Sequence, residues 1–438
     1  MTGCTFLERF RGKIALHLAG MVLLLLPRIA VPAWPPWLNE EERPVVYPEI
    51  VVSAEWLLER SSDPGLVVVD GRPREAFLRG HVPGALSLPA DSVSPGVSVA
   101  GLLARRGVRQ GEVAVLCGEE GAIGTAARLF YALEAAGVSD VRLLDRGVPG
   151  WIESGGALEG GAGEARAPTT PAAADTSRLA RPEYVLDHFG RDGCELIDCR
   201  VRTVRPPEKR EGWDEAIFRE GHIPHAMPFF FGSLLGEGGE VPEGPRVRAV
   251  IAHVGPRSGT LIHLDGEVIV YDDGPSGDAL LGYLLLRMAG VEQVRLFSGG
   301  FPAWFADPSR PVVRIDRAGQ VAELLGKARE HPDEEPPAPA LLFDVRHGSD
   351  YRAGHIPGAV HIPSSFFRDS LEVVLPRHYG RGDLRDVPLV TYCYGPDCIR
   401  SRNCATWAAQ AGFRDVRWFR GGMAEWKAEG RKVEREDG

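Results

Sequence analysis

Cysteine is scarce in this sequence, and its scarcity excludes two classes of protein. The 438 residues include seven cysteines, which are too few for a fold held together by disulfides. The two closest pairs, Cys194/Cys199 and Cys393/Cys398, do not show the Cys/His spacing of a zinc site. The place of each cysteine in the fold must therefore indicate what it does.

An excess of positive charge is also absent. Lys and Arg number 50 against 60 Asp and Glu, so the formal net charge is −10 and nucleic acid is not the expected partner. Apolar residues at 44% and charged residues at 25% are typical of a soluble globular chain, and exclude a disordered or polytopic membrane protein. At roughly 150 residues per domain, the length predicts about three domains.

A long apolar run is missing as well. The run Ile14–Leu26 has 13 residues, fewer than the ~20 that span a bilayer as a helix. Basic residues at positions 9, 11 and 13 precede it, and Val31-Pro32-Ala33 follows with small residues suited to cleavage. We expect residues 1–33 to be a cleaved export signal; the alternative is an uncleaved N-terminal anchor that associates with a membrane. Export predicts a periplasmic or otherwise exported protein in an oxidising compartment.

Three copies of one pattern fill the rest of the chain. Each copy has an apolar run ending in Asp-x-Arg, a Gly-His-x-Pro turn, a second apolar run and a Gly-rich turn before a Trp. We place the three repeats at residues 48–160, 182–314 and 316–434, with linkers at 167–180 and 314–319. The motifs fall at Asp70–Arg72, Gly80–Pro83, Val113–Cys117 and Gly147–Trp151; at Asp198–Arg200, Gly221–Pro224, Val268–Asp272 and Gly299–Trp304; and at Asp344–Arg346, Gly354–Pro357, Leu389–Cys393 and Gly421–Trp426.

Strands and helices alternate within each repeat. Short β-branched runs such as Leu66–Val69 predict buried strands, and stretches such as Ala126–Ala136 predict helices. The alternation predicts an α/β fold with three tandem domains, each a parallel sheet with helices on both faces. Open sheets of this kind bind ligands at the carboxyl ends of their strands, where the repeats place Cys117, Asp272 and Cys393.

These motifs together closely resemble the rhodanese-like family of sulfurtransferases, over about residues 48–434. The resemblance implies a rhodanese fold in each repeat and, where the loop cysteine is present, sulfur transfer through a cysteine persulfide. Such a relay requires no cofactor. By position, Cys393 matches the persulfide-forming cysteine of the family, and Cys117 is a second candidate. The implied partners are a small-molecule sulfur donor and a thiol acceptor.

The third loop carries the strongest candidate site. A sulfur-transfer cysteine must be a thiolate, whereas a free thiol is mostly protonated at neutral pH. Backbone N–H groups of a tight loop before a helix stabilise such an anion and also bind an anionic donor, and Arg side chains add to that binding. The predicted donor contacts around Cys393 are Tyr394, Gly395, Asp397, Arg400 and Arg346.

Cys398 lies five residues after Cys393 and is a candidate resolving thiol, which would attack a persulfide or sulfenate on Cys393. The alternative is that both are small buried groups, the role that we assign to Cys404 on the following helix. The doublet is also similar to that of exported rhodanese-like proteins associated with quinoprotein dehydrogenases. That similarity implies an exported redox or quinoprotein partner.

The other two loops differ from the third. Two glutamates follow Cys117, and because carboxylates raise the pKa of a thiol and repel an anionic donor, Cys117 is either a carrier for a neutral or cationic substrate or a structural residue. Asp272 heads the second loop and cannot form a persulfide, so this repeat resembles the inactive partner domains of tandem rhodaneses. Cys194 and Cys199 are expected on opposite faces of one strand, and therefore unpaired.

The remaining motif residues favour structural roles. Each Asp of Asp-x-Arg ends a strand, and we expect it to accept backbone hydrogen bonds or to pair with a nearby charge. The His of Gly-His-x-Pro also occurs in the repeat without a loop cysteine, so we expect it to order a turn. The Trp after each Gly-rich turn is expected to anchor the core.

The sequence thus predicts an exported sulfurtransferase that moves sulfane sulfur from a thiosulfate- or mercaptopyruvate-type donor to a thiol or cyanide through Cys393. Two alternatives remain open. One is a thiol/disulfide redox protein that uses Cys393 and Cys398, and the other is a non-catalytic rhodanese-type binding module. No metal site is predicted.

Overall fold

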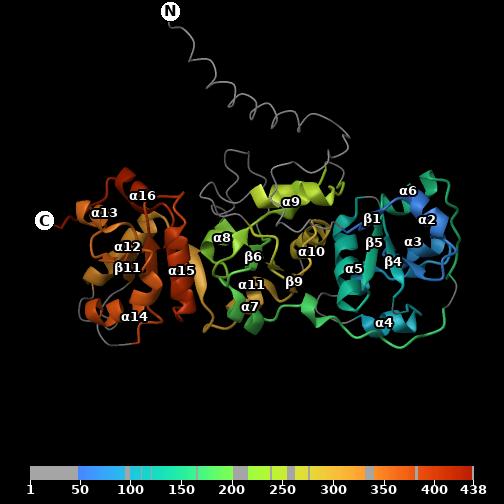
Figure 1. The fold of residues 1–438 in the computed structure, drawn as a ribbon, viewed down its shortest axis with the longest axis horizontal. Coiled ribbons are helices and arrows are strands. Elements are labelled where there is room, and N and C mark those ends of the chain that lie inside the picture. The colour runs from blue at the N-terminus through green and yellow to red at the C-terminus, as the bar shows by residue number, and fades with distance from the viewer. Residues whose placement is uncertain are drawn as a thin grey trace, which may run out of the picture. The chain divides into compact units, whose positions relative to one another are not determined.

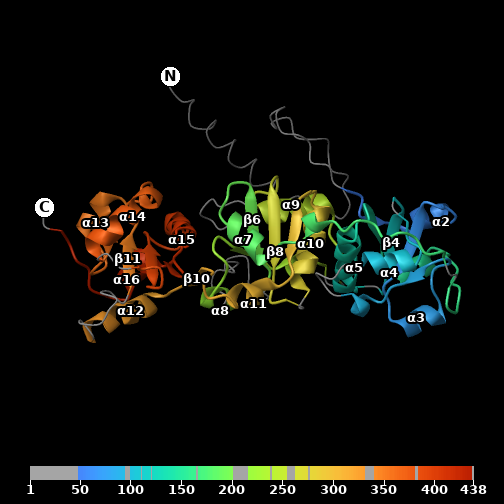
Figure 2. The same ribbon diagram turned by 90° about the horizontal axis from the view of Figure 1, so that it is seen from below.

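Three parallel sheets, one for each repeat, form the described part of the chain (Figure 1, Figure 2). Helices lie on both faces of the sheets, so the predicted fold class is confirmed. The structure is a computed structural model that describes residues 48–93, 99–109, 111–119, 121–163, 166–200, 216–236, 239–253, 262–274, 277–330, 340–379 and 383–436. The export-signal prediction for residues 1–33 lies outside these ranges. Within them, no helix is long and apolar enough to cross a membrane.

The first repeat has a five-stranded sheet in the order β1-β5-β4-β2-β3. Helices α2, α3 and α6 pack on one face around Trp151, and α4 and α5 pack on the other. The strands are β1 (Val51–Val52), β2 (Leu66–Asp70), β3 (Leu86–Ser87), β4 (Val113–Cys117) and β5 (Asp140–Leu144). The helices are α2 (Ala54–Arg60), α3 (Arg74–Arg79), α4 (Ala100–Arg105), α5 (Ile123–Ala135) and α6 (Gly147–Glu153), with a 3-10 turn η1 (Ala90–Ser92).

The second repeat has a four-stranded sheet in the order β7-β6-β8-β9. Its central strand β8 carries a continuous apolar run from Val268 to Tyr271 that is at most 1% exposed, as expected for a parallel strand covered on both faces. The strands are β6 (Cys194–Asp198), β7 (Met227–Pro228), β8 (Glu267–Tyr271) and β9 (Val294–Phe297). The helices are α7 (Pro182–His188), α8 (Ala216–Glu220), α9 (Gly244–His253), α10 (Asp278–Met288) and α11 (Gly300–Phe305), with 3-10 turns η2 (Thr176–Arg178) and η5 (Phe231–Leu234).

The third repeat again has five parallel strands, in the order β10-β14-β13-β11-β12. Helices α12 and α16 pack on one face of this sheet, and α14 and α15 pack on the other. The strands are β10 (Val312–Ile315), β11 (Leu341–Asp344), β12 (Val360–His361), β13 (Leu389–Tyr392) and β14 (Asp415–Phe419). The helices are α12 (Ala318–Glu330), α13 (Gly348–Ala353), α14 (Phe367–His378), α15 (Arg400–Gln410) and α16 (Gly422–Ala428).

Strand β10 corrects the predicted boundary between the second and third repeats. Val312, Val313 and Ile315 are buried, and β10 pairs along its whole length with β14 of the third sheet. The third repeat therefore begins at about residue 312, and the segment 314–319 contains part of a strand and the start of α12 rather than a linker. The local sequence did not predict β10, because its hydrogen-bonding partner, β14, lies far along the chain.

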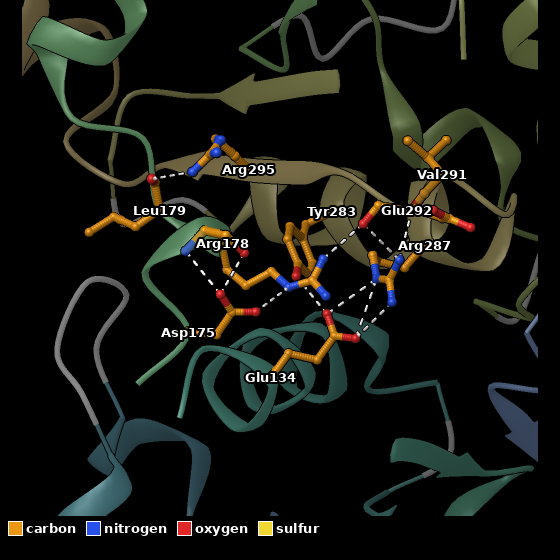
Figure 3. A network of polar contacts seen from close by, with 10 residues as sticks. Glu134, Asp175, Arg178, Leu179, Tyr283, Arg287, Val291, Glu292 and Arg295 are labelled. Carbon is orange, nitrogen blue, oxygen red and sulfur yellow. Dashed lines mark hydrogen bonds and ion pairs between the residues drawn. The ribbon is translucent and has the colours of Figure 1, made fainter. Parts of the chain in front are cut away.

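The helices that follow the first and second loops pack against each other. Glu134 on α5 accepts hydrogen bonds from the Tyr283 hydroxyl (2.5 Å) and from Arg287 Nη2 (3.2 Å), both on α10. Figure 3 shows the Glu134 carboxylate facing these two side chains. Because Glu134 is only 7% exposed, its charge needs such partners, and the network joins the first repeat to the second.

Candidate active site

Cys393 stands where the sequence predicted it. It directly follows β13, which lies between β14 and β11 in the middle of the third sheet, and a loop of residues 393–399 leads to α15. Cys393 is 1% exposed, whereas the next residue, Tyr394, is 39% exposed. The loop therefore begins inside the protein and opens to solvent within one residue.

Cys398 lies across this loop and forms a disulfide with Cys393. The backbone N–H of Cys398 donates to the Gly395 carbonyl (3.0 Å), which closes a turn that brings the chain back toward Cys393. The two Cα atoms are 6.3 Å apart, within the roughly 4.4–6.8 Å that a disulfide requires. The predicted proximity is therefore observed, and the resolving role of Cys398 stays a prediction.

A glycine in the last motif packs closely against the loop head. Gly422 has a φ of +53°, and a Cβ there would lie 2.4 Å from the Cys393 carbonyl oxygen, so no side chain fits. This close approach lets the N–H of Met423 donate to that carbonyl (3.0 Å). Gly147 and Gly300, at φ +58° and +56°, make the same approach to the loops of the first and second repeats. The Gly-rich motif thus brings a helix N-terminus against each loop.

The Asp-x-Arg motif is a buried structural pair. The Asp344 carboxylate accepts hydrogen bonds from the backbone N–H of Arg346 (3.0 Å), from its Nε and from its Nη2, and Arg346 Nη2 also donates to the Gly354 carbonyl (2.7 Å). The Tyr392 hydroxyl donates to the same carboxylate (2.8 Å). The structural role expected for these Asp residues is confirmed. The same pair occurs as Asp70–Arg72 and Asp198–Arg200.

Arg346 is less available to a donor than the sequence suggested. It is 4% exposed, and two of its three guanidinium nitrogens bind Asp344 or Gly354. Its guanidinium also lies over the ring of Tyr394 (5.8 Å to the centroid), and the Tyr394 hydroxyl donates to Asp350 (2.7 Å) at the start of α13. Arg346 and Tyr394 therefore form one wall of the loop. Their contact with a sulfur donor stays a prediction.

The other predicted contacts lie around the solvent side of the loop. Asp397 and Arg400 are exposed, and Gly395 is half-buried with its carbonyl in the turn to Cys398. Arg400 is the first residue of α15, so a cation stands beside the loop where an anionic donor would arrive.

Sequence reasoning missed a second cation, Arg420. Strands β13 and β14 pair so that Tyr392 lies beside Phe419, and Arg420 therefore follows β14 next to the point where Cys393 follows β13. Arg420 is 7% exposed, and burial lowers its pKa to about 10. The signal was present in the repeat, because the first and second copies have Asp145 and Ser298 at this position.

The His and Trp residues of the motifs have the structural roles that were expected. Each His stacks on the aromatic ring four residues before it and uses Nδ1 to bind that residue's carbonyl. Each Trp is at most 5% exposed and donates its Nε1–H to a carbonyl (2.8 Å) just beyond its helix. These residues are His81, His222 and His355, and Trp151, Trp304 and Trp426.

Cys117 in the first loop is poorly placed to ionise. It is the last residue of β4 and is 4% exposed. Burial, and then the charge of Asp70, raise the pKa of its thiol well above the usual value, and Arg72 only partly opposes them. The raised pKa agrees with the prediction, but its causes are burial and Asp70 rather than Glu119, which is exposed. Glu120 lies outside the described residues.

The second loop holds a carboxylate in place of a thiol. Asp272 is 3% exposed, and its two oxygens accept hydrogen bonds from the backbone N–H groups of Gly274 (2.7 Å) and Ala279 (3.0 Å). The backbone N–H groups of this loop thus bind the carboxylate of Asp272. Cys194 and Cys199 are both buried and free, so the prediction that they form no disulfide is confirmed.

Comparison with known proteins identifies the repeats. A model of the rhodanese-like domain matches residues 53–154, 181–307 and 321–429. The chain belongs to the rhodanese-like family. The three rhodanese repeats are therefore confirmed, and they account for the motifs described above.

Relatives of the rhodanese repeats include named enzymes. The chain is 26% identical to the 3-mercaptopyruvate sulfurtransferase of Escherichia coli K12 over 285 residues, covering 60% of this chain and 96% of the relative. It is 26% identical to the thiosulfate sulfurtransferase of Pseudomonas aeruginosa over 277 residues, covering 60% and 96%. The crystal structure of SseA from E. coli, titled as a 3-mercaptopyruvate sulfotransferase, matches with a TM-score of 0.46 at 25% identity, covering 58% of this chain and 99% of that one. The predicted enzyme class, that of sulfurtransferases, is confirmed.

Proposed function

We propose that this rhodanese-family protein is an exported sulfurtransferase whose third repeat carries sulfane sulfur as a persulfide on Cys393. The observation that carries the proposal is the head of the third loop, where a thiol lies at the carboxyl end of a central strand beside Arg400 and Arg420. The second repeat has Asp272 at that place, and the first has Cys117 with a raised pKa. The third loop thus combines a thiol with one cation at the start of the following helix and another at the end of the neighbouring strand.

The transfer consists of two displacements at sulfur. In the reduced protein the Cys393 thiolate attacks the outer sulfur of thiosulfate, the S–S bond of the donor breaks and sulfite leaves. A 3-mercaptopyruvate-type donor instead loses its C–S bond, and pyruvate forms after a proton is taken up. An acceptor thiolate then attacks the outer sulfur of the persulfide and the Cys393 thiolate leaves; cyanide would yield thiocyanate. The disulfide must first be reduced by two thiol equivalents, which supply the two electrons and leave as a disulfide of their own.

Charge supports an anionic donor. Arg400 is exposed at the first residue of α15, and the positive end of that helix points toward the loop. Arg420 adds a cation on the neighbouring strand end, and the low-dielectric surroundings that lower its pKa strengthen its attraction for an anion. Both donors named for the relatives are anions at neutral pH.

The test is mass spectrometry of the reduced protein after exposure to thiosulfate and, separately, to 3-mercaptopyruvate. We expect the mass of one added sulfur atom on the peptide that contains Cys393, and loss of turnover in Cys393→Ser. Addition to Cys117 alone would assign the chemistry to the first repeat. Full function in Cys393→Ser would favour a non-catalytic binding module.

A second candidate function is supported by the disulfide between Cys393 and Cys398. A pair that closes and opens reversibly would make the third repeat a thiol/disulfide redox protein, or would let Cys398 resolve the persulfide. Reversible reduction without any sulfur transfer would select the redox function. An exported redox or quinoprotein partner belongs to this candidate.

Export and membrane association remain part of the proposal. They rest on the basic residues and the short apolar run within residues 1–33. Recovery of a processed chain from the periplasm would support export, and an intact N-terminus in a membrane fraction would support an anchor.

A further inference from the structure

One face of α15, the helix that follows the sulfur loop, is attached to the second repeat. Arg402, Thr406 and Gln410 are four residues apart and therefore lie on one side of the helix. Arg402 Nη2 donates to the His225 carbonyl (2.6 Å), and Gln410 Nε2 donates to the Phe189 carbonyl (3.0 Å). Between them, Thr406 lies against the backbone of residue 190, where a Cβ would come within 2.7 Å of its methyl group. The helix is thus in contact with the second repeat along its whole length.

The buried charge of Arg402 costs more free energy than a simple packing contact requires. It is 4% exposed, and burial lowers its pKa to about 10, although the Glu195 carboxylate of β6 acts in the opposite direction. A buried ion pair that is replaced as a whole by apolar side chains often loses no stability, so a buried charged contact is weak evidence for a purely stabilising role. Arg402 also fixes a direction, because its Nη2 donates to one carbonyl of the second repeat.

The acceptor of Arg402 departs from the repeat. His225 has a φ of +67°, a conformation that side chains rarely adopt, whereas the equivalent positions of the first and third repeats are Gly84 (φ +73°) and Gly358 (φ +81°). The burial of His225 and the charge of Arg402 lower the pKa of its ring to about 3, so the ring is neutral and does not repel the guanidinium.

The contact fixes the first turn of α15, which directly follows the loop. Ser401 attaches the first turn to the third sheet, because its carbonyl accepts from Thr391 Oγ1 (2.8 Å) and its hydroxyl accepts from Trp418 Nε1 (3.0 Å). Arg402, the next residue, attaches the same turn to the second repeat. The direction of this turn sets where its backbone N–H groups point, and in the proposed function those groups would stabilise the Cys393 thiolate.

We propose that Arg402 is a positioning residue, through which the second repeat holds the first turn of α15 in the orientation that sulfur transfer at Cys393 requires. The inference rests on the proposed function of Cys393. It gives the second repeat, whose own loop head is a carboxylate, a defined part in the chemistry of the third.

The experiment measures the ionisation of Cys393 in the full chain, with Cys398→Ser in every variant so that one loop thiol remains. The rate of alkylation by iodoacetamide is followed against pH by mass spectrometry of the Cys393 peptide. Arg402→Met removes the hydrogen bond and the charge but keeps an unbranched side chain, and we expect the alkylation midpoint to rise by about one pH unit, a tenfold loss of thiolate below the midpoint. The other charged groups near the loop are unchanged in these variants: Asp344, Arg346, Asp350, Asp397, Arg400 and Arg420.

Matched controls separate this role from stability of the interface. Gln410→Ala removes the contact at the other end of the same face, and His225→Gly keeps the carbonyl that Arg402 needs; both should leave the midpoint in place. Arg402→Lys retains a cation and should give an intermediate midpoint, which keeps the test available should Arg402→Met not fold. An unchanged midpoint in a folded Arg402 variant, or an equal shift in Gln410→Ala, would overturn the proposal. Alkylation of Cys393 needs no sulfur donor. If the unmodified protein transfers no sulfur, that result therefore counts against the proposed function and not against the positioning role of Arg402.

Discussion

Replacing Cys398 by Ser should lengthen the life of a persulfide on Cys393. In the reduced protein the Cys398 thiolate attacks the Cys393 sulfur of the persulfide, a disulfide forms and hydrosulfide leaves. The structure already contains the product of this step, with Cα atoms 6.3 Å apart. The backbone of the loop can therefore hold the two cysteines at the distance that the product of this attack requires.

The size of the effect follows from the short connection between the two thiols. Groups joined by a short flexible segment meet at an effective concentration on the order of 1 mM or more, so with an added thiol at about 0.1 mM the internal attack is faster by roughly tenfold. Cys398→Ser leaves only the external reaction. The lifetime of the persulfide should therefore rise about tenfold at that thiol concentration, and by less as more thiol is added.

The assay loads the reduced protein with thiosulfate, removes the donor and follows the persulfide on the Cys393 peptide by mass spectrometry, together with released sulfide. Cys404→Ala is the matched control, because it removes a thiol that is 0% exposed on α15, the helix that follows the loop. The persulfide lifetime in this variant should equal that in the unmodified protein. Equal lifetimes in Cys398→Ser and the unmodified protein, with no sulfide released by either, would refute the resolving role.

Four further expectations concern other parts of the chain. Cys393→Ser should abolish sulfur transfer in steady-state assays while Cys117→Ser reduces it by less, since burial and Asp70 hold the Cys117 thiol protonated; the opposite ranking would move the active centre to the first repeat. Gly422→Ala should lower the free energy of unfolding by more than about 1 kcal/mol and reduce transfer, because its Cβ would meet the Cys393 carbonyl oxygen; a urea titration that matches the unmodified protein would contradict this. Burial lowers the pKa of His222 from 6.5 to about 3, so as the pH falls the unfolded chain takes up a proton before the folded chain does. The contribution of His222 to stability should therefore be complete above about pH 6.5 and be lost as the pH falls toward 3. A urea midpoint that does not fall over this range would exclude the effect. Mature protein from the native host should begin near Trp34, which N-terminal sequencing checks, and an intact N-terminus would favour an anchor.

The repeat made the third loop predictable from sequence. Three copies of the same motifs located the strand that ends at Cys393, because a continuous apolar run before a loop and a helix has few other interpretations in an α/β fold. The spacing to Cys398 likewise allowed a disulfide but did not require one. The distance between the two cysteines is set by the turn in which the Cys398 N–H donates to the Gly395 carbonyl. The composition of the sequence does not reveal a hydrogen bond of this kind.

The contacts between repeats were not predictable in this way. Arg402 and His225 are far apart in the chain, and no local pattern links a helix residue of one repeat to a backbone carbonyl of another. The same holds for Cys117, whose burial depends on the packing of several helices rather than on its neighbours in sequence. Position in the motif indicated a candidate nucleophile, whereas the raised pKa that opposes the role comes from the tertiary structure.

Strand β10 also bears on how the molecule unfolds. In the first and third repeats, the His of the Gly-His-x-Pro turn exchanges two backbone hydrogen bonds with a segment of its own repeat, at Glu159 and Glu434. In the second repeat the partner of His222 is Val313, at 3.0 Å in both directions, and Val313 simultaneously pairs with β14 in the third sheet. One four-residue strand therefore completes two repeats at once. Neither repeat can lose this strand without disturbing the other, so the second and third repeats should melt as one cooperative block in calorimetry. A chain cut on one side of β10 would separate the strand from the His222 turn, and a cut on the other side would separate it from the rest of the third sheet.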